Sequence, residues 1–291
     1  MIPARVAIAT CRDMPEIDPD DAPLIAPLAE RGVEVTPAVW DDPSVDWSAF
    51  DLTVIRSTWD YPRRWTEFLA WTRRVPRLAN PAEVVEWNTD KRYLDALAAA
   101  GAPAVQTVWA PPGEPWRPPA DGEWVVKPSV SVGSIDTGRY DMADPEQREL
   151  AGRLAARLHD AGRTVMIQPY LTAVDQHGET ALLFFGGRYS HAIRKGAMLG
   201  GPYQGVPSLY RREHIRPRQP SLAEREAAEK SLAAVPFPAD RLLYARVDLI
   251  RGPDAPVLVE LELTEPSVFL RHDAGAAERF AEAVCARLGI A

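Results

Sequence analysis

Lysine and cysteine are scarce in this chain of 291 residues, and long apolar runs are missing. The two cysteines, Cys11 and Cys285, lie far apart and without metal-ligand spacing, which excludes a disulfide framework and a cysteine-based metal site. No apolar stretch reaches the roughly 18 residues that a transmembrane helix requires. We therefore expect a cytoplasmic protein with no membrane partner.

Excess positive charge is also missing. The formal net charge is −8, from 33 Lys and Arg residues against 41 Asp and Glu residues. Binding to nucleic acid or to anionic lipid depends on basic patches, so we expect no nucleic-acid partner. The composition, with 46% hydrophobic residues, is typical of globular proteins, and the length predicts two or three subdomains. The sequence leaves open whether the chain forms a homo-oligomer.

Strand-like and helix-like segments alternate over the first 80 residues. Apolar, β-branched runs at 5–10, 33–40 and 51–56 predict strands, and apolar residues at helical spacing over 22–31 and 63–74 predict helices. This order is typical of an α/β domain built on a small parallel sheet.

Three polar residues stand at the end of the third predicted strand. Ligands of parallel sheets bind beyond the carboxyl ends of the strands, so Arg56, Ser57 and Asp60 are candidate substrate-binding residues. Arg56 suits a clamp for a carboxylate. Alternatively, Arg56 forms a structural ion pair with Asp60 or another carboxylate.

The few lysines occupy informative places. There are four of them against 29 arginines, and lysine offers a compact, mobile charge that suits a phosphate in motion. Lys91 falls in the first turn of a helix predicted over 89–100, where a cation requires a nearby anion. Lys127 ends an apolar strand over 123–128 and opens into a small-residue loop, a plausible phosphate cradle. An ordinary strand with a solvated turn is the alternative for Lys127.

The middle of the chain predicts a helix and a hairpin. Helical spacing over 145–161 is followed by an apolar segment at 165–171, and two strands at 179–186 and 190–195 predict the hairpin. Lys195 emerges at the end of that hairpin.

Two further features follow from this region. Residues 196–220, rich in Gly, Pro and Arg, predict either a mobile loop that closes over a site or an inert excursion. His191 is interpreted as a hydrogen-bonded partner in the sheet rather than as a general base.

The C-terminal part predicts a second hairpin whose polar residues share one face. A Gly252-Pro253 turn separates two strands, and the period of two places Glu260 and Glu262 on the same face, with Arg246 and Asp248 opposite them. Buried carboxylates require a counter-charge, and Mg²⁺ takes carboxylate oxygens and completes its shell with phosphates. A solvent-exposed sheet face is the alternative.

Together, these motifs resemble the ATP-grasp superfamily from the first strand to Pro266. The resemblance implies an α/β (α+β) ATP-grasp fold, in which a small parallel α/β domain precedes two antiparallel-sheet subdomains that clasp ATP. The expected divisions are an N-terminal domain at 1–88, a connecting helix and Pro-rich linker at 89–122, a small subdomain at 123–195 and a C-terminal subdomain at 196–291.

The resemblance also implies roles for individual residues. ATP and Mg²⁺ are the implied cofactors, with Mn²⁺ as an alternative metal. The implied ATP-binding residues are Lys91, Lys127, Ser129, Ser134, Gln168, Leu171, Lys195 and, for the ribose, Asp175 or Glu179; the implied metal ligands are Asp248, Glu260 and Glu262.

The chemistry implied by the resemblance is ADP-forming ligation. A small-molecule carboxylate attacks the γ-phosphate to give an acyl phosphate, which a nitrogen nucleophile then displaces. Arg246, Arg194 and Lys195 are the implied catalytic cations, and no general base is evident.

Three segments narrow the substrate class. Residues 55–61, 189–192 and 261–267 resemble an actinobacterial group that includes the cyclo-ligase of D-cycloserine biosynthesis. That resemblance implies activation of O-ureido-D-serine and ring closure by a nitrogen of the same molecule. The alternatives are an intermolecular carboxylate-amine ligase and a non-catalytic ATP-binding regulatory protein.

Overall fold

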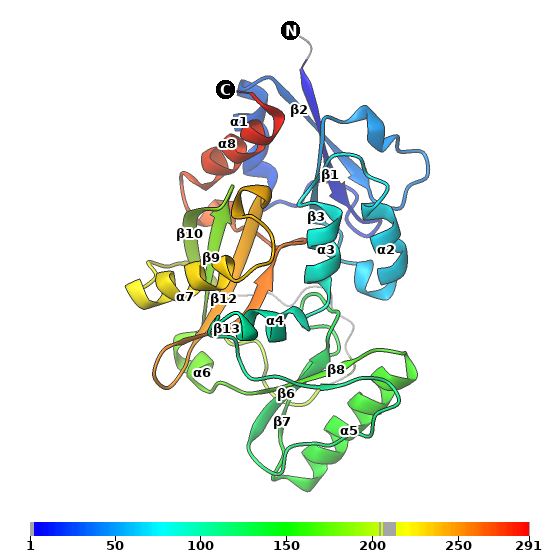
Figure 1. Cartoon of the computed structure of the whole chain (residues 1–291), viewed down its shortest axis with the longest axis vertical. Coiled ribbons are helices and arrows are strands. Elements are labelled where there is room, and N and C mark those ends of the chain that lie inside the picture. Colours follow the sequence, from blue (N-terminus) through cyan, green and yellow to red (C-terminus); the bar gives the residue numbers. More distant parts are fainter. Residues whose placement is uncertain (1–2, 204, 206–213, 291) are drawn as a thin grey trace.

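The computed structural model describes residues 3–203, 205 and 214–290. These residues form one parallel and two antiparallel sheets, with the parallel sheet at one end and a small antiparallel sheet at the other (Figure 1). The five-stranded antiparallel sheet lies between them. This arrangement confirms the α/β fold class with a small parallel domain and two antiparallel sheets.

The N-terminal sheet is parallel and has the order β2-β1-β3-β4. Every residue of its third strand is buried, because helices cover both faces and the strand carries apolar and β-branched side chains. The strands are β1 (Ala4–Thr10), β2 (Val33–Val39), β3 (Leu52–Ser57) and β4 (Leu78–Ala79), and the adjoining helices are α1 (Ile25–Glu30) and α2 (Trp65–Thr72).

The helix expected over 89–100 is wrong in its boundaries. Two helices occur instead, α3 (Ala82–Thr89) and α4 (Tyr93–Ala99). The backbone of Asp90 is extended, with φ −100° and ψ 115°, which ends the first helix. Lys91 therefore lies in the connection between two helices and not in a first helical turn.

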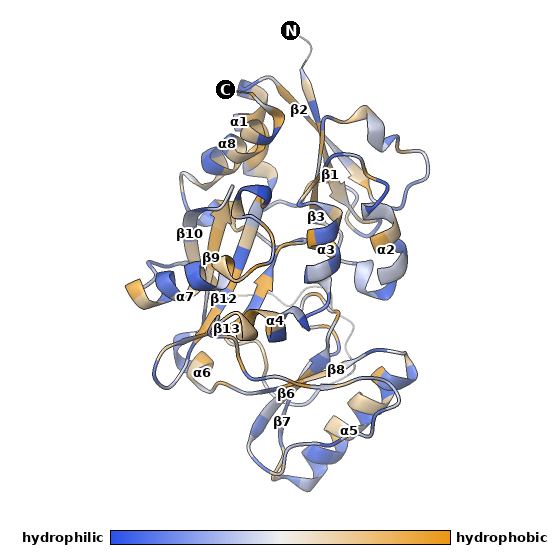
Figure 2. Cartoon of the chain, viewed as in Figure 1, coloured by the Kyte–Doolittle hydropathy of each residue, from blue (hydrophilic) through white to orange (hydrophobic). Residues whose placement is uncertain are grey.

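The small antiparallel sheet has the order β5-β8-β6-β7 and is covered by α5. In Figure 2, α5 shows both hydrophobic and hydrophilic residues, as expected for a helix with one face against a sheet. One strand, β5, comes from the segment expected to be a linker. The elements are β5 (Val108–Ala110), β6 (Glu123–Pro128), β7 (Gly138–Asp141), α5 (Pro145–Asp160) and β8 (Val165–Pro169).

The large antiparallel sheet has the order β11-β10-β9-β12-β13. Its pairing corrects the expected division at residue 195, because β9 pairs with β10 on one side and with β12 on the other. The hairpin at 179–195 thus belongs to the C-terminal sheet. The strands are β9 (Glu179–Phe185), β10 (Arg188–Lys195), β11 (Ile215–Pro217), β12 (Tyr244–Arg251) and β13 (Pro256–Glu262).

The segment 196–220 is only partly described. Its last part contains the edge strand β11, which pairs with the end of β10. Residues 204 and 206–213 lie outside the described residues, so the expectation of a closing loop stays a prediction.

Three further helices complete the described chain. The C-terminal helix α8 joins the N-terminal sheet to the large sheet through one shared hydrophobic core, in which Phe280 stacks on Phe185 with ring centroids 4.5 Å apart. No helix in the described ranges is long and apolar enough to cross a membrane. The helices are α6 (Ala173–His177), α7 (Leu222–Ala233) and α8 (Ala276–Leu288).

Candidate active site

Two adjoining cavities meet where the three sheets approach one another. The inter-sheet cavity, of about 190 Å³, lies between the small sheet and the large sheet. The N-terminal cavity, of about 170 Å³, extends toward Trp59 and Tyr61 of the N-terminal domain. Both cavities are lined by Lys91, Ser131, Gly133, Met198, Arg246, Glu260 and Glu262.

Most of the residues expected to bind ATP line the inter-sheet cavity. Together with the expected catalytic and metal-binding residues, they come from the α3–α4 connection, from β6, β8, β9, β10, β12 and β13, and from the loops after β6 and β8. This cavity therefore brings together side chains that are more than 160 residues apart in the chain. The expected residues that line it are Lys91, Lys127, Ser134, Gln168, Leu171, Glu179, Lys195, Arg246, Glu260 and Glu262.

The second hairpin has the expected register. Arg246 is paired with Glu262, and Asp248 with Glu260, across the antiparallel strands β12 and β13. The Gly252 amide donates to the Ala255 carbonyl at 3.0 Å and closes the turn. Alternate residues of these strands therefore carry the charged groups to one face, as the period of two predicts.

Cations and carboxylates are matched closely beneath the two cavities. Lys195 Nζ lies 2.8 Å from Oδ2 of Asp248 and also forms an ion pair with Glu179. Burial raises the pKa of Glu179 to about 7. Burial would also raise the pKa of Asp248, but Arg246 and Lys195 lower it to about 2. Asp248 is therefore an ionised carboxylate at neutral pH.

Arg246 bridges the two strands of the hairpin. Its Nε lies 2.9 Å from Oδ1 of Asp248, and its terminal nitrogen forms an ion pair with Glu262. Burial raises the pKa of Glu262 to about 7, although Arg246 opposes that shift. The guanidinium also lines both cavities, so it can contact a group bound in either of them.

Two lysines converge on one carboxylate. Lys91 Nζ lies 3.1 Å from Oε1 of Glu260, and Lys127 Nζ lies 3.9 Å from Oε2 of the same residue. Lys91 also donates to the Ser131 carbonyl at 2.9 Å, which ties it to the small-residue loop. Burial lowers the pKa of Lys127, and Glu260 opposes the shift. An anionic ligand at this point would take over part of the role of Glu260.

The three expected metal ligands differ in accessibility. The side chains of Glu260 and Glu262 are each 24% exposed, whereas Asp248 is 2% exposed and enclosed by Arg246 and Lys195. Within the described part of the chain, no group of three or more His, Cys, Asp or Glu side chains is arranged to hold a metal ion. The carboxylate oxygens of Glu260 and Glu262 fit a hard cation such as Mg²⁺. Asp248 would bind a metal ion only after its ion pair with Lys195 or with Arg246 is broken.

Three residues expected at the nucleotide or the oxyanion lie elsewhere. Ser129 uses its backbone, accepting from the Lys91 amide and donating to the Thr164 carbonyl, both at 2.9 Å. Asp175 pairs with Arg139 at 3.2 Å, and Arg194 donates to two carbonyls at the C-terminal end of α6. None of the three lines either cavity, so Glu179 is the better placed of the two ribose candidates.

The expected substrate residues at and just after the end of β3 also line neither cavity. Arg56 forms two hydrogen bonds of 2.9 Å with Asp21, and both side chains are buried. Asp60 accepts a hydrogen bond from Trp40, and Ser57 is buried within the strand. The reason is that β3 continues to Ser57 and carries Arg56 into the domain interior. Arg56 therefore forms a structural ion pair with another carboxylate, Asp21, which was the alternative to its role as a substrate clamp.

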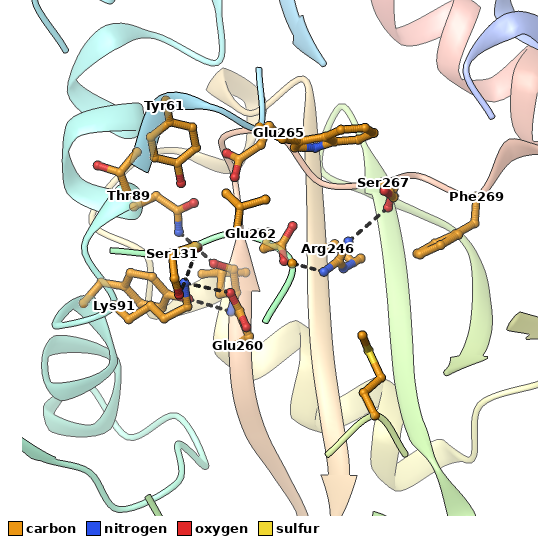
Figure 3. A pocket seen from close by; sticks show the side chains of 17 residues that line it. Tyr61, Thr89, Lys91, Ser131, Arg246, Glu260, Glu262, Glu265, Ser267 and Phe269 are labelled. Atoms are coloured by element: carbon orange, nitrogen blue, oxygen red, sulfur yellow. Dashed lines mark hydrogen bonds and ion pairs between the residues drawn. The ribbon is translucent and has the colours of Figure 1, made fainter. Parts of the chain in front are cut away.

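The N-terminal cavity contains residues that sequence reasoning did not select individually. Trp59 and Tyr61 reach it from the segment after β3. Glu265, Ser267 and Phe269 reach it from the loop after β13 (Figure 3). For Trp59, Tyr61, Glu265 and Ser267 the available signal was their place within the segments 55–61 and 261–267, whereas Phe269 lies beyond both segments. Asn88, Thr89 and Tyr93 complete this wall from α3 and α4.

His191 has the structural role expected of it. Its Nδ1 lies 2.8 Å from the Ser190 hydroxyl and its Nε2 lies 2.9 Å from the Val268 carbonyl. Burial lowers the pKa of His191 to about 4, so the ring is neutral at pH 7. It lines neither of the two cavities.

Comparison with known proteins identifies close relatives. The family model described as the N-terminal domain of D-cycloserine synthetase DcsG matches residues 6–80. The chain is 40% identical over 296 residues to the cycloserine biosynthesis protein DcsG of Streptomyces lavendulae, covering 94% of this chain and 95% of that protein. The crystal structure of D-cycloserine synthetase DcsG is 38% identical, covers 98% of this chain and all of its own, and superposes with a TM-score of 0.84.

A more distant structure shares the fold alone. D-alanine–D-alanine ligase from Bacillus anthracis is 13% identical and superposes with a TM-score of 0.65, covering 99% of this chain and 97% of its own. The similarity therefore extends over all three sheets.

Proposed function

Because the chain belongs to the DcsG family of ATP-grasp ligases, we propose that it closes the ring of D-cycloserine by ATP-dependent amide formation within O-ureido-D-serine. The observation that supports this proposal is the junction of the two cavities at Arg246, Glu260 and Glu262. A nucleotide in one cavity and a small carboxylate in the other would meet at this junction.

The inter-sheet cavity suits ATP. Lys91 and Lys127 would hold the phosphates, the segment from Gln168 to Leu171 would contact the adenine, and Glu179 would accept the ribose hydroxyls. Held by Glu260 and Glu262, Mg²⁺ or Mn²⁺ would supply positive charge to the transferring phosphoryl group. Lys91 and Lys127, which already approach Glu260, would add positive charge near the same group.

The reaction proceeds in two bond-forming steps. An oxygen of the substrate carboxylate attacks the γ-phosphorus, the bond to the β-phosphate oxygen breaks, and ADP leaves. The nitrogen bonded to the side-chain oxygen then attacks the acyl carbon, loses its proton, and expels phosphate. Water removes the carbamoyl group from that nitrogen as carbamate, which decomposes to ammonia and carbon dioxide.

Arg246 is the residue best placed to stabilise both steps. Its guanidinium lines both cavities, and its nitrogens already bind two carboxylates. A fixed cation aimed at the acyl oxygen stabilises the negative charge that develops there during nitrogen attack. Because the nucleophile belongs to the same molecule, the effective concentration of nitrogen is set by the bound conformation of the substrate.

The test is a product analysis with purified protein. ADP and products are measured by mass spectrometry after incubation with Mg²⁺-ATP and O-ureido-D-serine, with and without D-alanine as an external amine. We expect ADP and ring product in equal amounts without the amine. ADP formation that requires the amine would indicate an intermolecular ligase, and ATP binding without ADP formation would indicate a regulatory protein. Either result would contradict the proposal.

A further inference from the structure

Glu265 is a buried carboxylate in the wall of the N-terminal cavity. It is 7% exposed. Among the residues that the structure describes, Glu265 forms no ion pair, whereas its neighbours in the same cavity, Glu260 and Glu262, pair with Lys91 and Arg246. Ionising a buried carboxyl is costly without a cation, so the absence of an ion-pair partner suits a cationic group of a ligand, which would hold Glu265 in its ionised form.

The backbone next to Glu265 is held rigidly. The side chain of Asn88 donates to the Leu261 carbonyl at 2.8 Å and accepts from the Leu263 amide at 2.6 Å. Tyr244 donates to the Thr264 carbonyl at 2.8 Å. These bonds come from α3 and β12, so the fold determines where the loop after β13 places its carboxylate.

Tyr61 lies beside the side chain of Glu265. The Tyr61 hydroxyl faces the carboxylate in Figure 3, and the two groups are close enough for each to shift the pKa of the other. The ring of Tyr61 stacks on Phe68 with centroids 4.6 Å apart, which fixes the position of the hydroxyl. A carboxylate has more acceptor sites than one hydroxyl uses, so Glu265 can accept further hydrogen bonds from a ligand.

We propose that Glu265, oriented by Tyr61, binds the α-ammonium group of the amino-acid substrate. The proposal rests on the proposed function and adds to it the residue that recognises the group that does not react. Ring closure consumes the carboxylate and the nitrogen bonded to the side-chain oxygen, and the carbamoyl group leaves. Of the polar groups that can carry charge, the α-ammonium alone is unchanged throughout.

The charges of the N-terminal cavity agree with this orientation. Arg246 and Lys91 attract the substrate carboxylate toward the junction, and Glu265 lies apart from them beside Tyr61 (Figure 3). A charge-assisted hydrogen bond to Glu265 would therefore hold the opposite end of the amino acid. Burial raises the pKa of Glu265 to about 8, and an ammonium partner would favour its ionised form.

The test compares two enzymes with two substrates. Wild type and Glu265→Gln are assayed for ADP formation with O-ureido-D-serine and with 3-(ureidooxy)propanoate, which has hydrogen in place of the α-amino group. We expect wild type to prefer the amino acid by about 10- to 100-fold in kcat/KM, mainly through KM. Glu265→Gln should lose this preference while its KM for ATP stays unchanged. An equal preference in both enzymes would overturn the proposal.

Two controls separate this inference from its premise. If wild type forms no ADP with O-ureido-D-serine, the proposed function fails, and the role of Glu265 fails with it. If wild type is active, only the preference ratio decides the role of Glu265. Should Glu265→Gln not fold, the same ratio is measured with Tyr61→Phe, which keeps the stacked ring and removes the orienting hydroxyl. A preference that is unchanged in Tyr61→Phe would then overturn the proposal.

Discussion

Lys195 and Asp248 form an ion pair across a strand, with 2.8 Å between Nζ and Oδ2. Lys195 ends β10 and Asp248 lies on β12, and β9 separates these strands in the sheet. Both side chains are buried, at 10% and 2% exposure. The pair therefore joins the end of one hairpin to the carboxylate cluster of the other beneath the cavity junction.

Removal of the lysine from this pair should destabilise the fold. Lys195→Met leaves Asp248 buried with Arg246 as its remaining cation, which should lower the free energy of unfolding by about 3 kcal/mol. Adding Asp248→Asn should recover part of the loss, because the second variant removes the uncompensated charge. Urea unfolding of the two single variants and the double variant measures this coupling. Strictly additive losses would argue against the pair.

Lys127 should contribute to ATP binding. Lys127→Met should raise the KM for ATP at least about tenfold, which corresponds to roughly 1.4 kcal/mol. Lys230→Met is the matched control, because Lys230 is exposed on α7 and the substitution is chemically the same. Steady-state ADP formation at varied ATP measures both values. Equal KM values for the two variants would exclude the phosphate role.

Arg56 should stabilise the fold without binding substrate. Arg56→Met leaves Asp21 as a buried, unpaired carboxylate, and we expect a loss of about 3 to 5 kcal/mol in the free energy of unfolding. Asp21→Asn combined with Arg56→Met should recover much of this loss. The KM for the amino-acid substrate should stay within about twofold of wild type in the double variant. A large rise in KM for the amino-acid substrate with unchanged stability would instead indicate that Arg56 binds the substrate carboxylate, as the sequence predicts.

The titration of Glu265 should make stability depend on pH. Its pKa is raised from an ordinary value of 4.5 to about 8, first by burial and then by Glu262, while Lys91 and the Tyr61 hydroxyl oppose the shift and Glu260 adds to it. The protonated form is favoured in the folded state, so this contribution to stability is present at low pH and is lost as pH rises toward 8. The Glu265→Gln variant has no carboxyl at this position, so its stability lacks this dependence on pH.

This difference is measured by urea unfolding without nucleotide. Between pH 5.5 and pH 8.5 the stability of Glu265→Gln should increase relative to wild type, because the other charged groups around position 265 remain in both proteins. A constant difference over that range would show that the Glu265 carboxyl titrates normally.

Local patterns were sufficient to predict several parts of the molecule. The parallel N-terminal sheet, the 179–195 hairpin and the charged hairpin around Gly252 each follow from residues close together in the chain. The period of two placed Arg246 opposite Glu262, because side chains alternate across a strand regardless of the rest of the fold.

Other parts depended on contacts between distant segments. The pairing of β9 with β12 assigns the first hairpin to the C-terminal sheet, and no local pattern specifies that partner. The helices α7 and α8 were not predicted at all. The last of them is stabilised by packing such as the contact of Phe280 with Phe185, which only the folded chain provides.

The sequence by itself determined the fold class and the charged residues of the inter-sheet cavity, because lysine scarcity, strand periodicity and motif order are all properties of the chain. Only the tertiary structure decided which polar residues face a cavity. Arg56 turns inward to Asp21, whereas Glu265 reaches the N-terminal cavity without a cation of its own among the described residues. The reason is that burial and charge pairing depend on neighbours that come from other elements, and those neighbours exist only after folding.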